Sequence, residues 1–230
     1  MARLPTHEHF PTTHHTWLHE RITEGEESHQ VLCRELMTRY RVALLVYVRG
    51  STLRVIGEAD DIVHGFFEHF FSHPELLARW KTSGIPLRRW MINGLILHAR
   101  GLRRDASRNR EASGLQSVMT RASDEPEAAR AFEAAWAKSI LSDAATCVEM
   151  ELLDEGRSNA WEVFVRHVIA GEPYAQCYPP LGYTADEGRT VTRMVSTRIR
   201  RALQGLLRRE GTPDADIAQE QRRLEGLFEG

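Results

Sequence analysis

Apolar side chains recur every three or four positions along most of this chain, which is the spacing of one face of an α-helix. The spacing is clear over residues 31–48, 62–71 and 87–102. No segment shows sustained alternation of apolar and polar positions, the pattern of a half-buried β-strand. The pattern predicts an all-α protein, with three or four helices in a first small domain that covers residues 12–110.

A polar stretch with few large apolar side chains interrupts the helical pattern at residues 111–127 and predicts a flexible linker. Beyond it, the spacing predicts helices near 128–154, 158–170, 173–178 and 184–209. These helices form a second small domain over residues 128–211. The two ends are an N-terminal extension, residues 1–11, and a C-terminal tail, residues 212–230, in which a short final helix can carry Ile217, Leu224 and Phe228.

Positive charge is concentrated in two parts of the chain. The formal net charge is -2, but residues 88–110 hold seven arginines against one acid, and residues 189–209 hold seven arginines and no acid. The rest of the chain is therefore strongly acidic. Two basic helices in an acidic protein suit contact with a polyanion at two places, because local fields steer phosphate binding. For either stretch alone, a basic helix face that is merely solvated is the alternative.

The composition argues against membrane insertion and gives little support to catalysis. No run of about 18 or more apolar residues is present to span a bilayer, and the N-terminus lacks the apolar stretch of an export signal. We therefore expect a cytoplasmic protein without membrane contact. An enzyme is an alternative prompted by eleven histidines, which include His7, His9, His14, His15 and His19.

These histidines lack the spacing of zinc sites, and no Gly-rich phosphate loop, nucleophile elbow or paired-carboxylate arrangement occurs. We therefore expect no catalytic residue, no metal site and no cofactor. Stoichiometric zinc in the purified protein would revive the enzyme interpretation.

The segment 171–184, GEPYAQCYPPLGYT, and the basic stretch after it have the pattern of a helix-turn-helix: a helix, a turn that contains glycine, and a second helix. Thr184 and Glu187 have the spacing of a capping box, which marks the start of the second helix. Pro179 and Pro180 remove backbone donors, so the first helix must be short or distorted.

The second of these helices has two different faces. Val191, Val195 and Ile199 supply a packed face, and the residues on another face, which could enter a major groove, are Arg189, Arg193, Ser196 and Arg200. An arginine can pair with guanine or bind phosphate, and the sequence leaves both roles open.

The order of these elements resembles that of a known family. A helix with Tyr and Arg precedes an acidic-aromatic helix, ADDIVHGFFEHFF, a Trp-bearing basic helix, LRRWMINGLILHARGLRR, a polar linker and the helix-turn-helix. Over nearly its whole length the chain resembles the extracytoplasmic-function (ECF) sigma factors of bacterial RNA polymerase, and it looks most similar to the variety common in planctomycetes and myxobacteria. Short motifs of similar members occur in the same order: Thr12, Thr13, Thr16, Trp17 and Leu18, then Phe132, Trp136 and Ala137, then Gly171, Tyr174 and Ala175.

The resemblance implies a protein that binds core RNA polymerase, through its largest and second-largest subunits, and promoter DNA. The expected polymerase contacts are Asp60, Asp61, Phe66, Phe67 and Glu68, although Phe66 and Phe70 also suit a packed core. The expected contacts with the downstream promoter element are Arg88, Arg89, Trp90, Asn93, His98, Arg100, Arg103 and Arg104, and Trp90 equally suits a core anchor. The expected contacts with the upstream element are Thr184, Arg189, Arg193, Ser196, Arg200 and Arg201.

The chain also departs from this family. Leu97 stands where the family usually has an asparagine in the middle of the Trp-bearing helix, which puts the downstream promoter preference in doubt. Together with Pro179 and Pro180, this departure favours an alternative: a sigma-derived DNA-binding regulator or adaptor that no longer starts transcription. An anti-sigma factor or other regulatory partner is left open.

Overall fold

The computed structural model describes residues 26–111 and 125–226, and these residues form helices and connecting loops without a β-strand. The all-α prediction is therefore confirmed for the described residues. The α-helices are α2 (Glu26–Gly50), α3 (Ala59–Phe71), α4 (Glu75–Ser83), α5 (Leu87–Glu111), α6 (Pro126–Asp154), α7 (Ser158–Phe164), α8 (Tyr174–Cys177), α9 (Ala185–Arg209) and α10 (Asp214–Gly226). Two 3-10 turns, η1 (Thr52–Val55) and η3 (Pro179–Leu181), and a π-helical segment, η2 (Val165–Ile169), lie between some of them.

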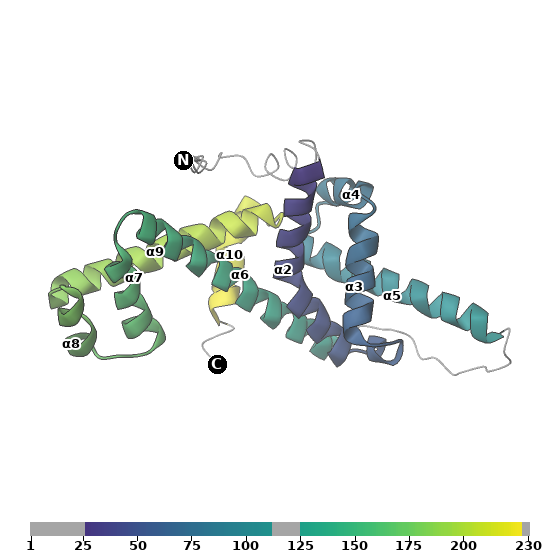
Figure 1. Ribbon diagram of the computed structural model, residues 1–230, viewed down its shortest axis with the longest axis horizontal. Helices are drawn as coiled ribbons and strands as arrows, with labels where there is room; N and C mark the ends of the chain where they lie inside the picture. Colours follow the sequence, from purple (N-terminus) through teal and green to yellow (C-terminus); the bar gives the residue numbers. More distant parts are fainter. Residues whose placement is uncertain (1–25, 112–124, 227–230) are drawn as a thin grey trace, which may run out of the picture.

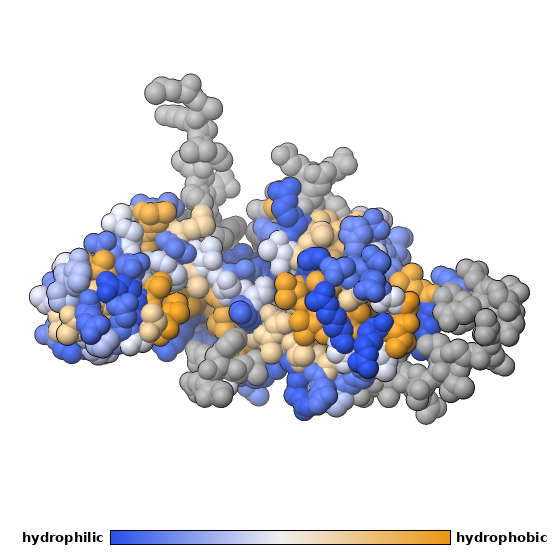
Figure 2. All heavy atoms as spheres, turned by 60° about the horizontal axis from the view of Figure 1, so that its bottom comes forward, coloured by the Kyte–Doolittle hydropathy of each residue, from blue (hydrophilic) through white to orange (hydrophobic). Residues whose placement is uncertain are grey.

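The helices form an elongated molecule with α2 and α6 near its middle (Figure 1). α2 packs along α6, and α6 in turn packs against α9. Helices α3, α4 and α5 lie on one side of α2, whereas α7, α8 and the first half of α9 form the opposite end (Figure 1). The surface seen in Figure 2 is largely hydrophilic, with separate apolar areas between the polar ones.

Among the residues that the structure describes, buried apolar side chains form two cores. The larger core combines residues of α2, α3, α4 and α5 with residues of α6, such as Trp136, of α9, such as Leu207, and of α10, such as Leu224. The smaller core lies between the second half of α6, α7, α8 and the first half of α9. The larger core thus contains helices from both sides of the predicted linker. The packing changes from the larger core to the smaller core within α6, which lies after the predicted linker. The division into two domains at residues 111–127 therefore stays a prediction.

The helix boundaries agree well with the sequence predictions. α6 and α9 begin and end within two residues of their expected positions. The expected final helix is α10, which buries Ile217 and Leu224, whereas Phe228 lies outside the described residues. The N-terminal extension, residues 1–11, the motif at residues 12–18 and most of the linker also lie outside them.

The two prolines before α9 have the expected effect on the preceding helix. α8 is four residues long, and η3 begins directly at Pro179. A single turn is shorter than the first helix of an ordinary helix-turn-helix, so the presence of that motif stays a prediction.

Candidate nucleic-acid interface

Helix α9 has a well-defined N-terminus. Gly182 takes a left-handed backbone conformation (φ 82°) that favours glycine. The Thr184 hydroxyl oxygen accepts a hydrogen bond from the Glu187 amide (3.3 Å), and the Glu187 carboxylate accepts one from the Thr184 amide (2.9 Å). Hydrogen bonds from the amide and hydroxyl of Thr184 hold the pKa of Glu187 below its ordinary value. The predicted capping box is confirmed, and Thr184, which was expected to contact DNA, serves as this cap.

Tyr178 holds the preceding turn against α9. Its ring is buried, and its hydroxyl lies 3.3 Å from the Thr192 hydroxyl. The ring lies on Gly188, where an added Cβ would come within 2.2 Å of a ring carbon. Gly188 therefore determines how closely α8 and η3 approach α9. This role of Gly188 was not predicted from the sequence. The signal that could have indicated it is an isolated glycine inside a helical pattern.

One side of α9 presents a set of polar side chains that we call the α9 basic face: Arg189, Arg193, Ser196 and Arg200. The three arginines are exposed, whereas Val191 and Val195 on the opposite side are buried. The predicted separation of a packed and a polar face is therefore confirmed. Arg201 is also exposed, but it lies about 100° farther round the helix than Arg200.

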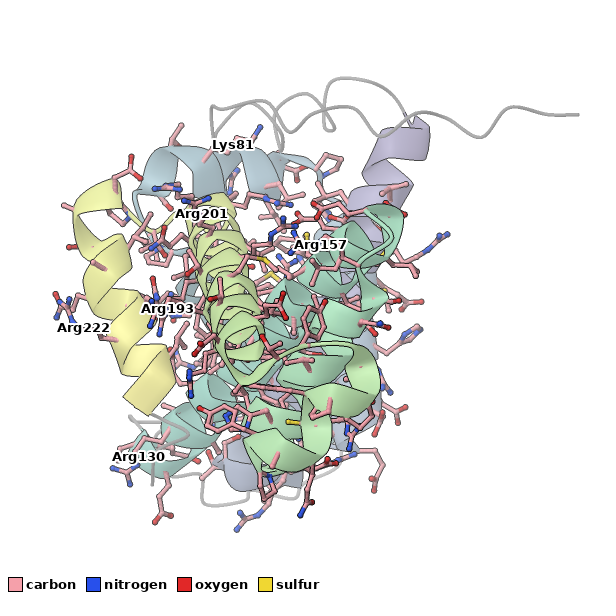
Figure 3. The ribbon with its side chains drawn as sticks, turned by 90° about the vertical axis from the view of Figure 1, so that its left-hand side faces the viewer. Lys81, Arg130, Arg157, Arg193, Arg201 and Arg222 are labelled. Atoms are coloured by element: carbon pink, nitrogen blue, oxygen red, sulfur yellow. The ribbon has the colours of Figure 1, made fainter. Side chains whose placement is uncertain are left out.

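The side chains of the α9 basic face differ in their partners. Arg189 forms an ion pair with Asp186, one turn earlier. The Ser196 hydroxyl donates a hydrogen bond to the Thr192 carbonyl oxygen (2.9 Å). Within residues 26–111 and 125–226, the guanidinium group of Arg193 forms no ion pair. Figure 3, viewed nearly along α9, shows Arg193 on the side of the helix where α10 lies.

The α9 basic face ends where α10 begins to cover it. Arg193, Arg200 and Leu207 are seven residues apart, which is nearly two helical turns, so they lie on the same side of α9. Leu207 is 0% exposed, and the Gln204 amide donates a hydrogen bond to the Gln221 side chain of α10 (2.9 Å). The face is therefore open from Arg189 to Arg200 and covered farther along the helix.

A second polar surface lies on α5. Arg89, Asn93, Leu97 and Arg100 recur at helical spacing and line a cavity of about 470 Å³, which we call the α5 cavity. Its other walls come from α2, η1 and the start of α6. Leu97 is 64% exposed there.

The remaining expected downstream contacts are distributed differently. Arg103 and Arg104 lie beyond the cavity toward the end of α5, and Trp90 is partly buried against the larger core. His98 lines a separate cavity of about 680 Å³ between α3 and α5. Burial, and to a smaller extent the charge of nearby His69, lowers the pKa of His98. The structure therefore separates His98 from Arg89, Asn93 and Arg100.

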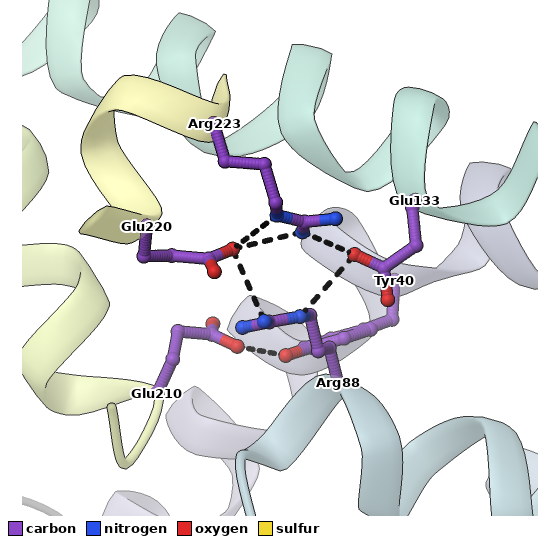
Figure 4. A network of polar contacts seen from close by, with 6 residues as sticks. All are labelled: Tyr40, Arg88, Glu133, Glu210, Glu220 and Arg223. Atoms are coloured by element: carbon purple, nitrogen blue, oxygen red, sulfur yellow. Dashed lines mark hydrogen bonds and ion pairs between the residues drawn. The ribbon is translucent and has the colours of Figure 1, made fainter. Parts of the chain in front are cut away.

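Arg88 is buried rather than available to DNA. The residue is 8% exposed, and its Nε lies 3.3 Å from a Glu133 carboxylate oxygen. One of its Nη atoms lies 3.1 Å from a Glu220 carboxylate oxygen, and the guanidinium carbon is 4.6 Å from the centre of the Trp136 ring (Figure 4). α6 and α10 therefore enclose the side chain of Arg88 in this arrangement, and its expected contact with DNA stays a prediction.

The expected polymerase-binding surface on α3 is only partly exposed. Phe66 and Phe67 are 2% and 1% exposed and both belong to the larger core, whereas their expected contact with a polymerase stays a prediction. Asp60 is half-exposed and forms ion pairs with two arginines of α2. Asp61 and Glu68 are exposed. Seven residues separate them, so they lie on one side of α3.

A buried polar cluster that the sequence analysis missed lies beside Arg88. The Tyr40 hydroxyl donates a hydrogen bond to the carboxylate of Glu210, which is 0% exposed (Figure 4). Arg39 lies 2.9 Å from Glu210 and 2.9 Å from Asp143. Burial, and then the charge of Glu210, raises the pKa of Tyr40 well above its ordinary value, so this hydroxyl remains a donor. No local signal could have identified these partners, because they come from α2, α6 and the end of α9.

The described residues contain no group of three or more His, Cys, Asp or Glu side chains arranged to hold a metal ion. His7, His9, His14, His15 and His19 lie outside these residues. None of the described helices is long and apolar enough to cross a membrane. No protein-family model matches the chain, and no curated protein or solved structure is significantly similar to it.

Proposed function

We propose that this protein is an ECF-type sigma factor, which binds core RNA polymerase in the cytoplasm and directs it to promoter DNA. The α9 basic face is the observation that carries the proposal. It is exposed and rich in arginine, and it lies on a helix whose start is capped and whose opposite side is packed. Such a face can enter a major groove and bind base edges or phosphates.

The α5 cavity supplies a second contact with promoter DNA. Arg89 and Arg100 can neutralise phosphates, and the Asn93 amide can both donate to and accept from a base edge. In this proposal α9 binds the upstream element as duplex, and α5 contacts the downstream element where the strands separate. Leu97 gives the α5 cavity an apolar side chain where the family has an asparagine. The side-chain amide on this wall then comes from Asn93, one turn earlier.

Polymerase binding is assigned to the exposed acids of α3. Asp61 and Glu68 lie on one side of this helix, and neither belongs to the buried core. Asp60 is a weaker candidate because Arg41 and Arg49 already neutralise its charge. The initiation chemistry itself belongs to the polymerase.

Charge reversal on α3 tests the polymerase contact. Asp61→Arg combined with Glu68→Arg should weaken co-purification with core RNA polymerase while leaving the thermal midpoint nearly unchanged, since exposed substitutions usually cost little stability. Glu75→Arg combined with Glu149→Arg changes two other exposed acids and the same net charge, and this control should bind core like the parent. Equal binding of both folded double variants would remove α3 as the docking surface.

A sigma-derived adaptor that binds DNA without starting transcription is the second candidate. The shortened α8 and the burial of Arg88 favour it, because both reduce the surface offered to promoter DNA. Transcription in vitro separates the two candidates. A sigma factor makes core polymerase start at a defined promoter, whereas an adaptor binds the same DNA and yields no transcript from added core.

A further inference from the structure

The C-terminal helix α10 packs against α9, and its Glu220 side chain meets Arg88 at the start of α5. It buries Ile217 and Leu224 in the larger core and is joined to the end of α9 by the Gln204 and Gln221 side chains. Arg208 of α9 also pairs with Asp214 at the start of α10 (2.7 Å). α10 is thus held at the place where the α9 basic face stops.

On its other side, α10 closes a cage round Arg88 (Figure 4). Glu220 binds Arg88 from α10, and Glu133 binds it from α6. Arg223 of α10 then joins these two carboxylates, at 2.6 Å from Glu133 and 2.8 Å from Glu220. The cage therefore contains two arginines and two glutamates. Removal of α10 would take away Glu220 and Arg223, and Glu133 would be the carboxylate of the cage that still pairs with Arg88.

The cage is not fully satisfied. Nε and Nη1 of Arg88 and Nε1 of Trp136 are buried without a hydrogen-bond partner among the described residues, although Nε lies 3.3 Å from Glu133 as an ion pair. Buried charges contribute little net stability unless their remaining donors are paired, because desolvation offsets the attraction. The contact between α10 and Arg88 is therefore specific in its geometry but is not an efficient stabilising interaction. Such a contact suits a junction that opens.

We propose that α10 is an inhibitory clasp, which keeps Arg88 away from nucleic acid and holds the part of α9 that follows the α9 basic face. Release of α10 removes Glu220 from Arg88, next to Arg89, and frees Arg208 of α9 from Asp214, so the affinity for DNA rises. The clasp rests on the proposed function, since it regulates the same two DNA-binding surfaces.

Two variants release the clasp in different ways. Glu220→Ala combined with Arg223→Ala removes the α10 side of the cage without a change in net charge. Leu224→Asp places a carboxylate in the core contact of α10. The control is Asp216→Ala combined with Arg222→Ala, which keeps the same net charge and changes exposed side chains of the same helix; Figure 3 shows Arg222 on the outer side of α10.

Hydrogen exchange measures the release, and binding to a mixed-sequence DNA duplex measures its consequence. In both release variants the amides of α10 should exchange at least about tenfold faster, while α7 and the first half of α9 keep their protection. The affinity for the duplex should rise about fivefold to tenfold at low salt, and addition of Arg88→Ala should abolish this gain. The control should match the parent in both measurements.

The outcomes distinguish the clasp from the function on which it rests. If the amides of α10 exchange faster in the release variants but these variants bind the duplex no more tightly than the parent does, the clasp is overturned. The proposed DNA binding then still stands. Unchanged exchange of α10 in both folded release variants also overturns it. If neither the parent nor any released variant binds DNA, alone or as holoenzyme, the proposed function fails and the clasp fails with it.

Discussion

Arg88 lies at the start of the basic helix α5, and Arg193 lies two turns into the basic helix α9, yet their guanidinium groups have opposite surroundings. Arg88 is enclosed by two carboxylates and an indole ring, whereas Arg193 is exposed and forms no ion pair with any of the described residues. Both come from arginine-rich segments that look alike in sequence. The difference shows that tertiary cover, rather than local composition, decides whether an arginine supports the fold or remains available to a ligand.

The same contrast extends to the two ends of the molecule. At the junction of α2, α6, α9 and α10, charged groups such as Glu210 are buried and joined to several partners. At the far end, ion pairs such as that of Arg198 with Glu155 lie at the surface. Buried and exposed ion pairs differ strongly in the cost of losing one partner, which gives a direct test of this contrast.

The largest effect should come from Glu210. Replacing Glu210 with Ala leaves the Tyr40 hydroxyl without its acceptor and takes one of the two carboxylates from Arg39. We expect the free energy of unfolding to fall by about 3–5 kcal/mol, the usual cost of breaking a buried charged interaction. Chemical denaturation of the parent and the variant measures this difference.

Glu155→Ala is the matched control, because it breaks the exposed pair with Arg198. Its stability should remain close to that of the parent. Equal losses in Glu210→Ala and Glu155→Ala would contradict the contrast between the buried junction and the exposed end.

A smaller effect is expected at the contact between Tyr178 and Gly188. Gly188→Ala adds a methyl group where the buried Tyr178 ring leaves no room, so the variant should lose about 1–3 kcal/mol of stability from overpacking. Gly205 lies in the same helix with open space around it, and Gly205→Ala should gain up to about 1 kcal/mol from helix propensity. Thermal unfolding of both variants measures whether each substitution lowers or raises stability. A gain in stability at both positions would show that the Tyr178 ring does not pack tightly against Gly188.

The smallest effect concerns pH and the cavity between α3 and α5. Burial and His69 lower the pKa of His98 in the folded protein, so the unfolded chain takes up this proton more readily. The folded state should therefore lose stability as pH falls below about 6.5, the ordinary histidine pKa. His98→Gln removes this contribution, so its unfolding free energy should depend less steeply on pH between about 5 and 7 than that of the parent. An identical slope in both proteins would place His98 in a more solvated site.

Much of the helical architecture could be predicted because its signals are local. The spacing of apolar residues gave the bounds of α6 and α9, and Thr184 with Glu187 marked the start of α9. The shortening of α8 followed from Pro179 and Pro180. Each of these features depends on residues within a few turns of one another.

The candidate site was less predictable because burial depends on distant elements. Phe66 and Phe67 suit either a docking surface or a core, and only the packing of α3 against its neighbours decides between them. Arg88 meets Glu133 and Glu220 across more than forty and more than a hundred residues of sequence. The helical pattern of α5 alone contains no information about these partners.

Salt-dependent binding of the polymerase holoenzyme to a mapped promoter, with Arg189, Arg193 and Arg200 each changed to Ala, tests the central claim that the α9 basic face binds promoter DNA. We expect Arg193→Ala to cost about 1–3 kcal/mol and to relax the preference at one base pair, because Arg193 lies about two turns into α9 and is proposed as a base reader. Arg200→Ala should weaken binding to all sequences and reduce the salt slope by about one, as expected for a phosphate contact. If all three variants bind and initiate like the parent, the α9 basic face is not a DNA-binding surface, and the account is contradicted.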